Sequence, residues 1–246
     1  MNDRFPRMAE YLVTDSASFA SKAAAQIGRA LGRSSETRRD LRLVLCGGST
    51  IAPVYEHLAA LRSVSLQWEA MSFYFGDERA VPPEHHDSNY RLAYQTLLSK
   101  IPADRERIHR MEAEREDLEK AARDYEALLP SSLDVLLLGM GADGHIASLF
   151  PGSPGLEATS RRVVSAFGGN PPVARLTITP RVLTEAREII VMVNGSAKQA
   201  AVARALEGPL DPFACPAQLV RRATWVLDQA AAEGLRSASG SPERRL

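Results

Sequence analysis

Asp143 and His145 lie close together in a glycine-rich segment, Gly139–His145, that follows the predicted, mostly apolar strand 134–138. An imidazole titrates near neutral pH, so a histidine in such a turn can act as a general base. A neighbouring carboxylate could orient the ring and stabilise its protonated form. We therefore take His145 and Asp143 as candidate catalytic residues, with a purely structural histidine as the alternative.

The same segment matches the Gly-x-Gly-x-x-Gly pattern of dinucleotide-binding folds. That pattern is informative only where a long helix follows the last glycine and an acidic residue ends the next strand. Here Pro151 would end any helix within two turns, and the next predicted strand, 162–167, runs into Gly168 and Gly169. We interpret the segment as a turn that projects the two candidate catalytic side chains, and we expect no cofactor.

A second turn, Gly47-Gly48-Ser49-Thr50, follows the predicted strand 41–46 and precedes a helical pattern. Glycines let backbone N–H groups approach an anion closely, and the hydroxyls and the helix N-terminus add donors. A phosphate or carboxylate would suit this turn. The alternative is a plain strand-to-helix turn in which Ser49 or Thr50 caps the helix. A nucleotide P-loop is excluded because no Gly-Lys-Ser/Thr follows.

A charged loop also follows the predicted strand 71–75, where the run Gly76-Asp77-Glu78-Arg79 leads on to Ser88 and Asn89. Two carboxylates beside a guanidinium could hold a sugar hydroxyl, a phosphate or a developing oxyanion. The alternative is a solvated ion-pair cluster, with Ser88 capping the next helix. Whether Asp77, Glu78 and Asn89 touch a ligand or only brace Arg79 stays open.

Two further cations stand near predicted strand ends: Arg175 opens 175–179, and Lys198 follows 188–193. Each is usually a surface charge. A lysine in the first turn of a helix opposes the helix dipole, which favours a functional role for Lys198.

Metal and nucleophile chemistry have little support. His85, His86 and Asp87 look like metal ligands, but adjacent histidines in a proline-rich loop lack the one-face spacing of a helical zinc site, so we expect no metal. The sequence has no Gly-x-Ser-x-Gly elbow. Cys46 reads as a small buried residue, and Cys46 and Cys215 are expected to be reduced.

Short apolar runs alternate with longer helical patterns. The predicted strands are 41–46, 71–75, 134–138, 162–167, 175–179, 188–193 and 224–227. The predicted helices are 16–32, 53–62, 89–99, 116–129 and 196–206. Several strands lack polar alternation, as do strands covered on both faces. The pattern predicts a layered α/β fold with a mostly parallel central sheet flanked by helices, in which ligands bind beyond the carboxyl ends of the strands.

Length and composition suit one globular domain. The 246 residues are 45% hydrophobic and 24% charged, and we predict one domain over 1–236 and a polar, disordered tail over 237–246. The charges of the 30 basic and 30 acidic residues cancel, so the net charge does not favour binding to nucleic acid or to an anionic membrane. The N-terminus has no apolar signal segment and no stretch approaches the ~20 apolar residues of a membrane span. We therefore expect a cytoplasmic protein.

Taken together, the polar segments resemble the 6-phosphogluconolactonases, which share a superfamily with the glucosamine-6-phosphate deaminases. The resembling segments are Gly47–Thr50, Gly76–Pro82, Ser88–Tyr90, Leu138–Gly152, Pro171-Pro172 with Arg175–Pro180, and Gly195–Lys198. They occur in the family's order between about residues 41 and 228. The resemblance implies a Rossmann-like layered fold and a phosphate pocket for a sugar-phosphate lactone.

Carried over by position, the resemblance implies that His145 is the general base, Asp143 its neighbour, and Arg79 a residue at the substrate. The implied substrate and phosphate ligands are Gly47, Gly48, Ser49, Thr50, Asp77, Asn89, Arg175 and Lys198. The family usually has proline after Gly-Gly-Ser-Thr, where this chain has Ile51. Because isoleucine leaves the backbone angle free, we expect a small effect on the rigidity of the turn.

The implied activity is hydrolysis of 6-phospho-D-glucono-1,5-lactone in the pentose phosphate pathway, by a monomer without metal or cofactor. Deaminases continue Asp-Gly-His-Ile-Ala with Phe-Asn-Glu-Pro, and their glutamate takes part in ring opening. This chain reads Ser148-Leu149-Phe150-Pro151, which argues against the deaminase alternative. A sugar-phosphate-binding regulator without turnover is the other alternative, but such a protein would not need a base at His145.

Overall fold

A computed structural model describes residues 10–61, 66–169 and 172–236. Its larger sheet has six strands in the order β1-β9-β8-β5-β2-β3, and every neighbouring pair is parallel. These strands are β1 Glu10–Thr14, β2 Arg42–Leu45, β3 Ser72–Phe75, β5 Leu133–Gly139, β8 Ala186–Val193 and β9 Thr224–Asp228. The central strand β5 is buried over all but its last residue, which explains its unbroken apolar sequence. The prediction of a layered α/β fold with a mostly parallel sheet is confirmed.

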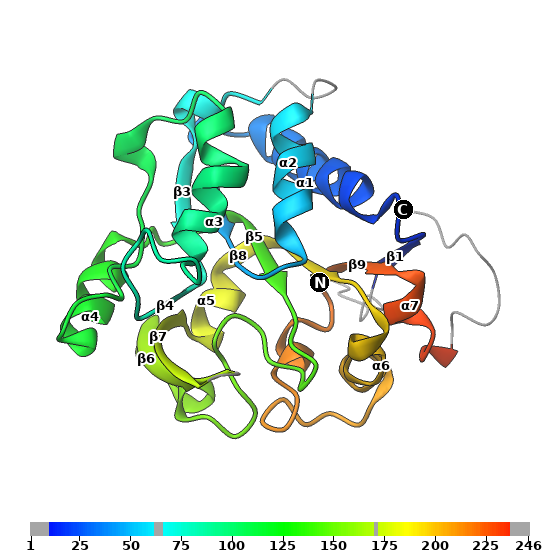
Figure 1. The fold of residues 1–246 in the computed structure, drawn as a ribbon. Coiled ribbons are helices and arrows are strands. Elements are labelled where there is room, and N and C mark those ends of the chain that lie inside the picture. The colour runs from blue at the N-terminus through cyan, green and yellow to red at the C-terminus, as the bar shows by residue number, and fades with distance from the viewer. Residues whose placement is uncertain (1–9, 62–65, 170–171, 237–246) are drawn as a thin grey trace, which may run out of the picture.

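Helices flank this sheet. They are α1 Phe19–Ser35, α2 Ile51–Ala60, α3 Asn89–Thr96, α4 Leu118–Leu128, α5 Pro180–Glu185, α6 Gln199–Glu207 and α7 Gln229–Ala232. Helices α1, α2 and α3 lie side by side, and α6 and α7 form a second group (Figure 1). In α1 the apolar side chains of Phe19, Ala23, Ile27 and Leu31 recur every fourth residue and all are buried, so this face packs into the core.

A smaller antiparallel sheet, β4-β7-β6, adjoins the first. Its strands are β4 Asp77–Arg79, β6 Val163–Gly168 and β7 Val173–Ile178. The chain passes from one sheet to the other at Gly76, whose N–H donates to Leu45 O and whose carbonyl accepts from Ile178 N, both at 2.9 Å. The interpretation of Asp77–Arg79 as a loop after β3 is therefore wrong. A charged three-residue strand shows neither an apolar run nor a recognisable alternation.

Other sequence expectations are met in part. Strand β1 and the short helices α5 and α7 were not predicted, because each is too short to show a clear period. The prediction of one domain over 1–236 stays a prediction, and the predicted tail 237–246 lies outside the described residues. None of the helices in the described ranges is long and apolar enough to cross a bilayer.

Candidate functional site

Three turns meet at one edge of the larger sheet. Gly47–Thr50 follows β2, Gly139–His145 follows β5, and Asn194–Lys198 follows β8. Strand β5 lies between the other two, and all three run parallel. The carboxyl ends of adjacent parallel strands form one edge, which is the usual ligand position in open α/β sheets. The sequence-predicted base and the sequence-predicted phosphate turn therefore lie on the same edge.

Side chains join the three turns. Thr50 Oγ1 donates to Asn194 Oδ1 at 2.6 Å, and Lys198 Nζ donates to Met140 O at 2.8 Å. Burial lowers the pKa of Lys198, although the nearby carboxylate of Asp143 opposes that shift. Lys198 therefore holds its ammonium group beside the histidine turn, at the sheet edge where an anion would bind.

The Gly47–Thr50 turn remains open to a ligand. Gly48 has φ +99°, a left-handed conformation that glycine adopts without strain. Thr50 occupies the cap position of α2, but its side chain makes no capping hydrogen bond, and Ser49 is exposed. The capping interpretation therefore does not explain the Thr50 hydroxyl. In the first turn of α2, Ile51 N–H donates to Gly48 O at 3.3 Å and Pro53 has no N–H, which leaves Ala52 N–H and the Gly48–Thr50 turn itself for an anion.

His145 and Asp143 form a hydrogen-bonded pair. The ring Nδ1 lies 2.6 Å from Asp143 Oδ1, which also accepts from His145 N–H at 3.1 Å. Burial acts to raise the pKa of Asp143, but the hydrogen bond and charge of His145 outweigh it and lower that pKa to about 2. An ionised carboxylate therefore holds Nδ1 as the donor, which leaves the lone pair of Nε2 for a proton from water. The side chain of His145 is 30% exposed, so water can reach it.

The backbone around His145 is shaped by small residues. A Cβ on Gly141 would lie 2.1 Å from His145 Nδ1, and a Cβ on Gly144, which has φ +91°, would lie 2.9 Å from Cys215 Sγ. Ala147 has φ 48° and is the one non-glycine residue with positive φ in the described part of the chain. Residues held in such sparsely populated conformations cluster at active sites and ligand clamps.

Phe150 packs against both His145 and Arg175. Its ring centroid lies 4.8 Å from that of His145, and Arg175 Cζ lies 5.6 Å from the Phe150 centroid. In the deaminase pattern this position carries the glutamate of ring opening. Here an aromatic face contacts the imidazole, so the position offers no carboxylate to the site.

Arg79 and Arg175 are direct cross-strand partners in β4 and β7. Side chains directly opposite each other project from the same face, and like charges there destabilise the pair. Asp77 Oδ2 lies 3.7 Å from Arg175 Nη1 and offsets part of this repulsion. Burial lowers the pKa of Arg175, Asp77 raises it and the charge of Arg79 lowers it, with a net downward shift. An anionic group bound at either guanidinium group would relieve part of the remaining repulsion.

Arg79 also has an unused donor. Its Nη1 donates to the carbonyl of Asp87, while its buried Nε has no hydrogen-bond partner among the described residues. A buried donor without a partner costs free energy, and a ligand oxygen could satisfy it. This is the geometry expected of a residue that binds substrate.

Asp77 and Asn89 connect the elements that form the site. Asp77 Oδ1 accepts from Asn89 Nδ2 at 3.0 Å, and Asp77 Oδ2 accepts from Ser148 Oγ at 2.6 Å. The side chain of Asn89 packs against Gly47, where a Cβ would lie 1.7 Å from Asn89 Oδ1. Both side chains are buried, and their contacts connect β4 with Ser148 and with the Gly47–Thr50 turn. These contacts give Asp77 a bracing role, whereas Asn89 Oδ1, like Arg79 Nε, has no hydrogen-bond partner among the described residues and is available to a ligand.

Glu78 is a supporting residue that the sequence did not single out from its charged run. Its carboxylate accepts from the backbone N–H groups of Arg79, Asn89 and Tyr90 at 2.9, 2.7 and 2.8 Å, and from Ser88 Oγ at 3.1 Å. Burial raises its pKa, and the hydrogen bonds oppose that shift. Ser88 in turn caps α3 by accepting from Arg91 N–H, as the ion-pair alternative expected. Glu78 thus ties β4 to the start of α3.

Replacing Glu78 by glutamine is expected to lower the free energy of unfolding by about 1–3 kcal/mol. An amide has one acceptor oxygen, and its NH₂ group would face N–H groups that now meet a carboxylate oxygen. Urea denaturation of Glu78→Gln against wild type measures the change. The matched control is Glu84→Gln at an exposed position nearby, which should leave stability unaltered; equal stability of both variants would remove Glu78 from this role.

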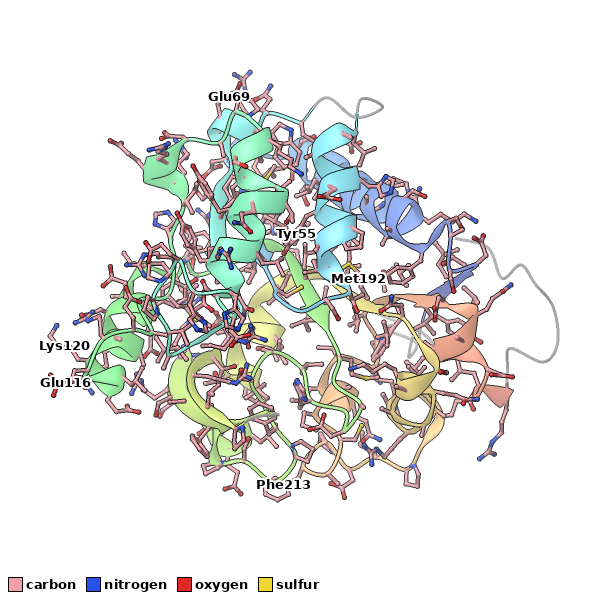
Figure 2. The ribbon with its side chains drawn as sticks, viewed as in Figure 1. Tyr55, Glu69, Glu116, Lys120, Met192 and Phe213 are labelled. Atoms are coloured by element: carbon pink, nitrogen blue, oxygen red, sulfur yellow. The ribbon has the colours of Figure 1, made fainter. Side chains whose placement is uncertain are left out.

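Tyr55 supports the start of the Gly47–Thr50 turn from within the core. Figure 2 shows this side chain on α2 near the centre of the molecule, where its hydroxyl donates to Cys46 O at 2.9 Å and accepts from Cys46 N–H at 3.0 Å. Burial raises the pKa of the Cys46 thiol to about 12. Cys46 is therefore a packed residue rather than a nucleophile, as its sequence context indicated.

Known proteins share this architecture. Residues 14–227 match the family described as glucosamine-6-phosphate isomerases/6-phosphogluconolactonase. A 6-phosphogluconolactonase of Synechocystis is 35% identical over 79% of this chain and 84% of its own length. A 6-phosphogluconolactonase structure from Trypanosoma cruzi has TM-score 0.82 at 28% identity and covers 96% of this chain and 100% of that one. A monomeric glucosamine-6-phosphate deaminase has TM-score 0.80 at 22% identity over 92% and 99% of the two chains, so the fold alone does not separate the two activities.

Proposed function

The chain belongs to the glucosamine-6-phosphate isomerase/6-phosphogluconolactonase family, and within it we infer that it is a 6-phosphogluconolactonase in which His145 is the general base. The substrate is 6-phospho-D-glucono-1,5-lactone and the product 6-phospho-D-gluconate. The observation that carries the catalytic assignment is the His145–Asp143 pair on the same sheet edge as the Gly47–Thr50 turn. Phe150 in place of a carboxylate favours lactone hydrolysis over amino-sugar ring opening.

In this mechanism the phosphate anchors the substrate. The dianion binds the N–H groups and hydroxyls of Gly48, Ser49 and Thr50, together with the cations of Lys198 and Arg175. Fixing the distant end of the substrate places the lactone carbonyl at His145. Such positioning converts attack by water into a reaction within one complex.

The chemical step then needs one base and one stabilised oxyanion. His145 Nε2 removes a proton from water while the water oxygen bonds to the carbonyl carbon. The Arg79 guanidinium then stabilises the resulting oxyanion. When the tetrahedral intermediate collapses, the carbon–ring-oxygen bond breaks, and protonated His145 returns the proton to the leaving oxygen. General-base catalysis of about 10²–10⁴-fold and an oxyanion contact of about 10²–10³-fold are the expected contributions.

A hydrolysis assay tests the activity itself. Purified protein should consume 6-phosphogluconolactone well above the spontaneous rate, because the lactone also hydrolyses in water unaided. A chain that binds the lactone without accelerating its loss would instead be a regulator. Release of ammonia from glucosamine 6-phosphate would point to the deaminase branch. The monomeric state and the cytoplasmic location stay predictions.

Lys198→Ala is expected to raise KM for the phosphorylated lactone by about tenfold or more, because one charge-assisted hydrogen bond to the phosphate is lost. The unphosphorylated lactone lacks that partner, so its KM should change little. Steady-state kinetics with both substrates measure the difference. The control is Lys100→Ala, which removes a lysine paired with Glu56 on the surface; an unchanged KM in Lys198→Ala would contradict the phosphate assignment.

A further inference from the structure

The loop between β4 and α3 carries three potential metal ligands whose donor atoms converge. His85, His86 and Asp87 each offer one ligand atom, and these atoms lie within 4.8 Å of one another. Asp87 Oδ2 is 3.7 Å from His85 Nδ1 and 3.5 Å from His86 Nε2. In a tetrahedral zinc site, with bonds of about 2.0–2.2 Å, ligand atoms lie about 3.3–3.6 Å apart. Two of the three spacings are therefore close to those that a bound cation requires.

The loop backbone is fixed by its own contacts. His85 N–H donates to Pro82 O at 2.9 Å, and Ser88 N–H donates to His85 O at 3.0 Å, so two successive turns hold the segment. Arg79 Nη1 donates to the carbonyl of Asp87, immediately before the Ser88 cap of α3. The ligands thus stand on ordered backbone before any cation arrives, which reduces the ordering cost of binding.

The chemistry of the three ligands selects the class of cation. Two imidazoles and one carboxylate suit Zn²⁺ and similar transition metals, whereas Mg²⁺ and Ca²⁺ prefer oxygen ligands. The side chains of His85, His86 and Asp87 are 38%, 74% and 59% exposed, so a cation reaches them directly and water can complete the coordination. From the sequence we expected no metal, because adjacent residues lack the one-face spacing of a helical zinc site. The two successive turns of this loop instead bring the three ligand atoms together without a helix.

We propose that His85, His86 and Asp87 form a surface site for a divalent transition-metal cation of the zinc class, and that these three side chains supply no group to the lactone reaction. Two features limit its affinity. Asp87 N–H donates to His85 Nδ1 at 3.2 Å, and the cation must displace that long hydrogen bond. The positive charge of Arg79, held at the Asp87 carbonyl, also opposes a cation, although salt screens exposed charges.

Isothermal titration calorimetry with ZnCl₂ on the full chain, purified without a histidine tag, tests the site. We expect one Zn²⁺ per chain, and we expect zinc affinity to fall by about 10–100-fold or more in His85→Ala and in His86→Ala. Loss of a residue that only orients a metal ligand already lowers affinity by about this much, and loss of the ligand itself should cost at least as much. Co²⁺ should give the visible absorption of a four-coordinate ion, and this signal should fall in the same variants. Circular dichroism checks that both variants are folded.

Two control variants locate the binding. His57→Ala removes an exposed histidine of α2, and His145→Ala removes a histidine outside the loop whose ring is hydrogen-bonded to a carboxylate; both should bind Zn²⁺ like the wild type. The proposal is overturned if the wild type binds no zinc. It is overturned equally if folded His85→Ala and His86→Ala keep wild-type affinity, or if only His145→Ala loses binding.

Discussion

His145→Ala is expected to lower kcat for 6-phosphogluconolactone by about 10²–10⁴-fold at neutral pH. The imidazole is the group in this site that can take a proton from water and return it to the leaving oxygen. Asp143 cannot replace it efficiently, because a carboxylate whose pKa is about 2 is a weak base. The phosphate ligands remain in place, so KM should change little. Initial-rate kinetics corrected for spontaneous hydrolysis measure both constants.

The matched control for this variant is His109→Ala. His109 stacks on Tyr74 at a centroid distance of 4.7 Å and lies in the segment that joins α3 to α4, away from the three turns. The His109→Ala substitution removes an imidazole and leaves the residues of the proposed site unchanged, so kcat should stay near that of the wild type. A near-normal kcat in folded His145→Ala would remove that residue from the mechanism.

Gly141→Ala is expected to lower kcat by about 10²-fold while the protein stays folded. The added methyl group would lie 2.1 Å from His145 Nδ1 and 2.5 Å from Asp143 Oδ1. The imidazole must turn away from its carboxylate to make room, and a misplacement of about 1 Å can cost about this much in rate. Gly141 does not have the left-handed backbone conformation, so alanine is compatible with its φ. Kinetics and a thermal melt on the same sample separate misplacement from unfolding.

Gly139→Ala tests the specificity of that effect. Gly139 ends β5 in the same turn, but a Cβ there would meet nothing closer than Gly47 O at 3.9 Å, which is ordinary contact. We expect this variant to keep most of the wild-type kcat. Equal losses in the two glycine variants would indicate general damage to the turn and not displacement of the His145 ring.

Much of the fold was predictable because it rests on local signals. The apolar segments that became β2, β5, β8 and β9 are long enough to show burial on both faces, and the polar turns after β2, β5 and β8 meet because adjacent parallel strands share one edge. The sequence could therefore place His145 and the Gly47–Thr50 turn in one region. Recognition of the family added their roles, which neither periodicity nor spacing supplies.

The second sheet could not be predicted in the same way. Strand β4 is three residues long and charged, so its pairing with β7 depends on contacts between residues almost a hundred positions apart in sequence. That register alone places Arg79 opposite Arg175. The different roles of Asp77 and Glu78 also depend on tertiary contacts. Glu78 accepts from the backbone N–H of Asn89, whereas Asp77 accepts from the side chains of Asn89 and Ser148.

The most direct test of the central claim is an NMR titration with the reaction product, 6-phosphogluconate. If the phosphate turn and the base share one ligand, the backbone amides of Gly48, Ser49 and Thr50 and the ring signals of His145 should shift together, with one common Kd. Inorganic phosphate should move the amides of the turn and have a smaller effect on the ring. Product binding that moves the ring and leaves the three amides unchanged, or the reverse, would contradict the account.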